Sequence, residues 1–63
     1  MNIDTYVIHV NGEVWCLELN GKHLGTFNER AEAEKAAEVA ARMSQKRGRA
    51  AEILIDDGKS SEE

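Results

Sequence analysis

Two Asn-Gly pairs lie nine residues apart in this 63-residue chain, at Asn11-Gly12 and Asn20-Gly21. Each pair separates short runs that are rich in β-branched, aromatic and leucine residues. Asn-Gly accepts the positive φ angles of a type I′ turn, which makes it the strongest short-range signal for a β-hairpin. The two pairs therefore predict a three-stranded antiparallel meander, with strands at residues 5–10, 13–19 and 23–27.

A single helix is predicted to follow the meander, over residues 29–47. This segment is rich in Ala, Glu, Lys and Arg and contains neither Gly nor Pro. Asn28 is a favourable N-cap residue before it, and Gly48 is placed to end it. One stripe at helical spacing carries mostly small side chains, namely Ala33, Ala36, Ala37, Ala40 and Met43. Such a stripe lets the helix lie close to a sheet.

The run from Ala51 to Ile55 predicts a fourth strand, so the fold class is α+β with the order β-β-β-α-β. The helix is expected to cover one face of the sheet, and the fourth strand to run parallel to the first. A position beside the first strand is favoured, while pairing with the third strand and exchange between two subunits stay open. Residues 1–56 are expected to form one domain, and residues 57–63 a polar, disordered tail.

The first turn predicts which side chains share a face of the sheet. A two-residue loop at Asn11-Gly12 would place Ile8 opposite Trp15. The face toward the helix would then hold Tyr6, Ile8, Val10, Trp15, Leu17 and Leu19. The outer face would hold Thr5, Val7, His9, Val14, Cys16 and Glu18. Leu24 and Phe27 both resemble core residues, so a bulge is expected near Gly25.

An apolar centre on the predicted outer face is formed by Val7, Val14 and Cys16. An uncovered sheet face in a small domain often shows a few such residues. The alternative interpretation is a contact surface for a second copy of the chain or for another protein.

One constellation of residues would suit catalysis or metal binding, and it combines His9, Cys16, Glu18 and His23. With two-residue turns, His9 would lie opposite Val14 and His23 opposite Glu18, about 13 Å apart at about 3.3 Å per residue. Ligands of one metal ion cannot be separated that far. We therefore expect no catalytic, cofactor-binding or metal site, and we expect the protein not to be an enzyme.

The charge balance argues against direct binding to nucleic acid. The net charge is -4, and residues 1–55 carry eight acidic and seven basic side chains, without the positive excess that such binding requires. The lone cysteine predicts a reducing compartment. The sequence shows neither a signal peptide nor an apolar run long enough for a membrane span. A cytoplasmic location is therefore expected.

Several features from Tyr6 to Lys59 resemble a small prokaryotic domain family of unknown function. They are the strand Ile8–Val10, Gly12 with the strand Trp15–Leu17, Phe27 with Glu32-Ala33, Gly48, the strand Glu52–Ile55 and Asp57-Gly58-Lys59. The resemblance implies the same fold and supplies no activity. In its small size, acidic charge and single-domain β/α organisation, the chain also looks like small phage-encoded proteins of the anti-CRISPR type.

The leading functional hypothesis is a non-enzymatic protein-interaction module that forms a homodimer or binds another protein. The alternative is a phage or mobile-element inhibitor that binds a nucleic-acid-handling complex through acidic residues of the helix or the tail. The candidate interface residues under these two hypotheses are Val7, His9, Val14, Cys16, Glu32, Glu34 and Glu38.

Overall fold

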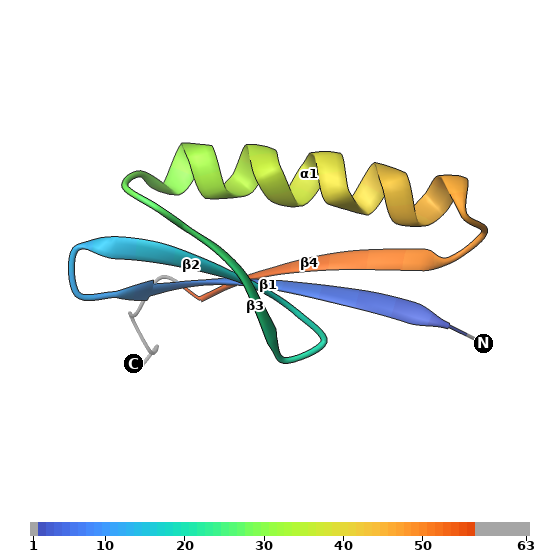
Figure 1. The fold of residues 1–63 in the computed structure, drawn as a ribbon, viewed down its shortest axis with the longest axis horizontal. Helices are drawn as coiled ribbons and strands as arrows, with labels where there is room; N and C mark the ends of the chain where they lie inside the picture. The colour runs from blue at the N-terminus through green and yellow to red at the C-terminus, as the bar shows by residue number, and fades with distance from the viewer. Residues whose placement is uncertain (1, 57–63) are drawn as a thin grey trace, which may run out of the picture.

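A computed structural model describes residues 2–56 of the chain. Its elements are β1 (Ile3–Asn11), β2 (Val14–Leu19), β3 (Lys22–Phe27), α1 (Arg30–Lys46) and β4 (Ala50–Asp56). The strands form one sheet in the order β3-β2-β1-β4, in which β4 is parallel to β1 and the other pairs are antiparallel (Figure 1). The predicted α+β fold and the position of the fourth strand are therefore confirmed. The predicted tail at 57–63 lies outside the described residues.

The first hairpin turns one residue later than predicted. Asn11 is paired with Val14, so the two-residue loop is Gly12-Glu13. Gly12 has a φ of 67° and Glu13 has no positive φ, as in a type II′ turn with Gly at its first central position. The predicted register is therefore wrong by two residues. An even shift keeps every side chain on its predicted face, because side chains alternate with a period of two.

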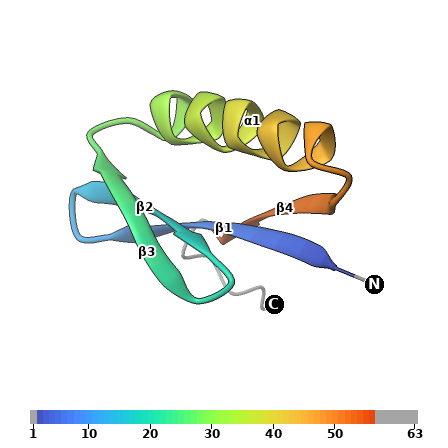
Figure 2. The ribbon, with the colours of Figure 1, turned by 45° about the vertical axis from the view of Figure 1, so that its right-hand side comes forward.

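The second hairpin turns at Asn20-Gly21 as predicted, with φ angles of 53° and 87° that fit a type I′ turn. Beyond this turn the register of β3 shifts opposite Leu17 and Glu18, which confirms the predicted bulge. The extra residue is Leu24, and the shift directs Phe27 toward the core opposite Trp15. Leu24 itself is exposed, so its predicted place in the core is wrong. Figure 2 shows β3 curving from this turn up to the start of α1.

The helix begins one residue later and ends one residue earlier than predicted, and Gly48 terminates it as expected. Its N-cap is Glu29, without a side-chain capping bond, so the prediction of Asn28 is wrong. At the other end Gly48 has a φ of 83°. The amides of Gly48 and Arg49 donate to the carbonyls of Gln45 and Ser44 at 3.0 Å each. This pair of bonds is the Schellman motif, which needs a left-handed residue where Gly48 lies.

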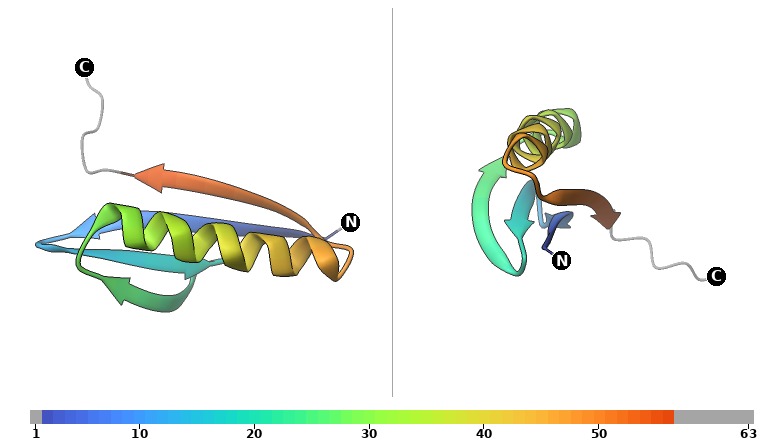
Figure 3. Two further views of the ribbon diagram at one scale, coloured as in Figure 1. Left: turned by 90° about the horizontal axis from the view of Figure 1, so that it is seen from above. Right: turned by 90° about the vertical axis from the view of Figure 1, so that its right-hand side faces the viewer.

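The helix packs on one face of the sheet through very small side chains (Figures 1 and 3). Its buried residues are Ala33, Ala37, Ala41 and Ser44, and they lie over a core of Tyr6, Ile8 and Leu17. The predicted stripe is correct at its alanines and wrong at Met43, which is half exposed. The opposite face of the sheet carries no second layer within the described residues (Figure 3).

Candidate functional site

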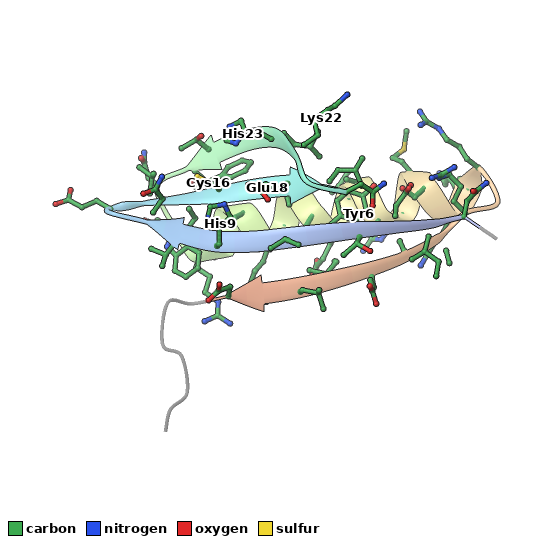
Figure 4. The ribbon with its side chains drawn as sticks, turned by 90° about the horizontal axis from the view of Figure 1, so that it is seen from below. Tyr6, His9, Cys16, Glu18, Lys22 and His23 are labelled. Carbon is green, nitrogen blue, oxygen red and sulfur yellow. The ribbon has the colours of Figure 1, made fainter. Side chains whose placement is uncertain are left out.

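The uncovered side of the sheet, here called the open face, gathers most of the predicted interface residues (Figure 4). The pairing of β1 with β2 places Val7, His9, Val14 and Cys16 on it. The parallel pairing of β1 with β4 adds residues of β4, since Thr5 lies beside Glu52 and Val7 beside Leu54. The open face therefore includes Thr5, Val7, His9, Val14, Cys16, Glu18, His23, Glu52 and Leu54.

The apolar centre of the open face is the pair Val7 and Leu54, because the observed register places Glu18 opposite Val7 and His9 opposite Cys16. Cys16 is only 8% exposed, although it lies on the side away from the helix. Val7 and Val14 are half-buried, and Leu54 is 49% exposed beside Val7. Leu54 was absent from the sequence prediction, although the alternation along Ala50–Asp56 could have suggested that it points away from the core. The apolar area thus extends from Val7 onto β4, whereas Cys16 and Val14 lie farther from Val7 than predicted.

The polar residues of the open face lie closer together than predicted. His9 is directly opposite Cys16, and its Nε2 atom lies 3.2 Å from Oε2 of Glu18. His23 is opposite Glu18, and its Nε2 atom lies 3.2 Å from Oγ1 of Thr26. The two histidines thus flank neighbouring positions of β2, at about 7 Å along the strand. The predicted separation of 13 Å is wrong because the first hairpin turns later.

His9, Glu18 and His23 form a surface cluster that offers hydrogen bonds and charge. His9 and Glu18 are each about one-third exposed, with 31% and 33% of their side chains accessible. In the described part of the chain, no three His, Cys, Asp or Glu side chains are grouped closely enough to hold a metal ion. No pocket opens there either. The arrangement can therefore contribute polar contacts around the apolar centre.

The three glutamates of the predicted interface lie on a different surface. Glu32 and Glu38 are exposed on α1, on the other side of the sheet from the open face. Glu34 is paired with Arg30, with 2.6 Å between Oε2 and Nε. The Arg30 guanidinium in turn lies 5.9 Å from the ring centre of Trp15. The seven predicted interface residues therefore divide between two surfaces.

A buried polar cluster fastens the end of α1 to the sheet. Asp4 is 6% exposed on the core side of β1. It accepts hydrogen bonds from Nε of Arg49 at 2.9 Å and from Nη2 of the same side chain, and it also accepts from Ser44. The Tyr6 hydroxyl lies 2.6 Å from Oγ of Ser44. Sequence reasoning missed this cluster, although Asp4 shares the alternation of Tyr6 and Ile8 along β1.

The Arg49 guanidinium, with help from the Ser44 hydroxyl, holds the pKa of Asp4 far below its usual range. In the unfolded chain the same carboxyl binds a proton near pH 3.9. The ionised form therefore stabilises the fold fully above about pH 4, and this stabilisation is lost as the pH falls below that value.

We expect the melting temperature of the Asp4→Asn variant to be lower than that of the parent at pH 6. The difference between the two proteins should shrink as the pH falls toward about 2, because the unfolded parent binds a proton at Asp4 below about pH 4 and Asn has no such group. Thermal unfolding followed by circular dichroism across this range measures both curves. Other carboxylates titrate equally in both proteins, so parallel curves would contradict the proposed role of Asp4.

No helix within residues 2–56 combines the length and the apolar character needed to cross a bilayer. No family model matches the chain, and no curated protein or solved structure matches it either. The similarity to anti-CRISPR proteins accordingly gains no support.

Proposed function

We propose that this protein is a non-enzymatic interaction module that binds a partner protein through its open face. The observation that carries the proposal is the exposed Leu54 beside Val7, an apolar pair on a face that no other element of the described chain covers. Exposed apolar side chains surrounded by polar ones are typical of protein-binding sites.

The rim of the open face indicates the chemistry of the partner. Glu18 and Glu52 carry negative charge on either side of the apolar centre, and Glu52 lies 3.2 Å from the Thr5 hydroxyl. His9 can supply a hydrogen bond beside Glu18. A complementary partner would present apolar side chains flanked by Lys or Arg, which favours both correct orientation and fast association.

Binding without catalysis also agrees with the position of the only thiol. Cys16 is enclosed between β1 and β3, opposite His9 on one side and Thr26 on the other. With 8% of its surface accessible, it has little room to approach a substrate as a nucleophile. Reactive cysteines are generally at least partly exposed.

We expect Leu54→Glu to weaken partner binding by about tenfold or more, since a carboxylate would replace an apolar contact inside an acidic rim. The partner is first captured in cells of the source organism with a photoreactive amino acid at position 54. Its affinity for the parent and for Leu54→Glu is then measured by isothermal titration calorimetry. Because Leu54 is half exposed, the fold should tolerate the change.

The matched control carries the photoreactive residue at Glu38 on α1, on the far side of the molecule. A partner that cross-links from position 54 and not from position 38 supports the proposal, provided that Leu54→Glu weakens its binding. A captured protein that binds Leu54→Glu as tightly as the parent would overturn it.

A further inference from the structure

The outward flank of α1 carries a second apolar strip. Val39 is 50% exposed and Met43 is 49% exposed, and the half-buried Ala36 adjoins them one turn earlier. Charged residues lie at the two ends of this strip, Glu32 in the first turn and Lys46 in the last. We call this flank the seam, and it consists of Glu32, Ala36, Val39, Met43 and Lys46.

The spacing along the seam alternates between four and three residues. This spacing places the five side chains along one side of the helix, as lengthwise packing against another helix at a crossing angle of about 20° requires. Apart from Ala36, which also packs against the core, the seam lies outside the face with which α1 packs on its own sheet, where Ala33, Ala37, Ala41 and Ser44 are buried. A second helical surface is therefore available while the fold stays intact.

The charges at the two ends make the seam complementary to itself. Glu32 lies seven residues before Val39, and Lys46 lies seven residues after it, or about 10 Å in each direction. In an antiparallel pair with its two-fold axis at Val39, Glu32 of each copy would lie at the level of Lys46 of the other. Ala36 would lie near Met43 in the same way, a small side chain facing a long one.

Both terminal charges are available for such contacts. Within residues 2–56, neither Glu32 nor Lys46 takes part in an ion pair. Glu34, on another flank of the helix, is by contrast already paired with Arg30.

We infer that α1 pairs antiparallel with α1 of a second copy through the seam. Such an isologous contact closes into a dimer with two-fold symmetry. The two open faces would then lie on the outside of the dimer, so that one dimer presents two partner-binding surfaces. The inference stands independently of the proposed function, because self-association needs no partner.

The seam is short, so the dimer should be weak and sensitive to salt. From Glu32 to Lys46 the helix rises about 21 Å, and a contact of that length falls in the small class of transient interfaces. The ion pairs at its ends are exposed and are screened by added salt.

Sedimentation equilibrium at low ionic strength tests this pairing over a range of protein concentrations. Glu32→Lys should weaken dimerisation by about tenfold, or about 1.4 kcal/mol, because symmetry turns two attractive contacts into two repulsive ones. The double variant Glu32→Lys/Lys46→Glu should restore dimerisation, since it exchanges the two charges. Glu38→Lys makes the same charge change on the same helix outside the seam and should leave the dimer unaffected.

A further variant, Val39→Lys, places two charges at the two-fold axis and should abolish the dimer. Circular dichroism should show it folded, because Val39 is half exposed. Three results would overturn the inference: a monomer at every concentration, an equal effect of Glu38→Lys and Glu32→Lys, or no rescue by the double variant. A dimer that is broken by Leu54→Glu and not by Val39→Lys would place the second copy on the open face instead.

Discussion

Replacing Ile8 by Ala is expected to lower the free energy of unfolding by about 2–5 kcal/mol. Ile8 is fully inaccessible and is the largest side chain to be so among residues 2–56. It lies at the centre of the sheet, between Leu17 on β2 and Ile55 on β4. The loss combines the transfer of apolar surface with a cavity that its neighbours cannot fill. At about 0.05–0.15 kcal/mol per residue, a chain of 63 residues has a stability of about 3–9 kcal/mol, so a loss at the upper end of the expected range would unfold much of it.

The matched control is Ile55→Ala, because Ile55 is the direct neighbour of Ile8 on the same face of the sheet. Its side chain is 43% exposed, so we expect the same substitution to cost about 1 kcal/mol or less. Urea unfolding followed by circular dichroism gives both free energies with one method. Equal losses at the two positions would show that the centre of the core lies elsewhere.

The order of elements was predictable because turns and periodicity are local properties of the sequence. Asn20-Gly21 forms the expected type I′ turn, and Gly48 ends the helix as expected. The first hairpin was misplaced because Asn11-Gly12 fits a type I′ turn while Gly12-Glu13 fits a type II′ turn equally well. The sequence does not distinguish these loops. The faces were still correct, since both loops contain two residues.

The candidate site was predictable only where a tight turn sets the register. The pairing of β1 with β2 follows from a hairpin, so Val7, Val14 and Cys16 were placed on the correct face, although the shifted register puts Val7 opposite Glu18 and away from Cys16 and Val14. Leu54 reaches the open face through the parallel pairing of β4 with β1. The crossover between these strands contains the whole of α1, so no turn residue sets their register. Contacts of this kind depend on the packed structure.

The rotation of the helix about its axis was predicted incompletely for a similar reason. Hydrophobicity selects Met43 as the buried residue in the last turns, whereas the structure buries Ser44. The Ser44 hydroxyl is placed between the Tyr6 hydroxyl and Asp4, so it is satisfied by hydrogen bonds when buried. This polar contact directs Met43 outward, where it becomes part of the seam.

Enlarging a side chain between α1 and the sheet should lower the free energy of unfolding nearly as much as the cavity left by Ile8→Ala. Ala37→Leu is expected to cost about 1–3 kcal/mol, because Ala37 is fully inaccessible and packs in the same cluster as Tyr6 and Ile8. The added carbons can be accommodated only if α1 moves away from the sheet. Such a movement would strain the bonds that join Tyr6 to Ser44 and to the carbonyl of Ala40.

The control for this substitution is Ala31→Leu, at an exposed position of the same helix. Leu and Ala differ little in helix propensity, so we expect this control to change stability by about 0.5 kcal/mol or less. Urea unfolding should therefore show a lower midpoint for Ala37→Leu alone, with a similar slope in all three proteins. If both leucine variants matched the parent, the small size of Ala37 would not set the distance between helix and sheet. A loss confined to Ala37→Leu would mean that the alanine stripe determines how closely α1 lies on the sheet, and so how far the seam stands from the open face.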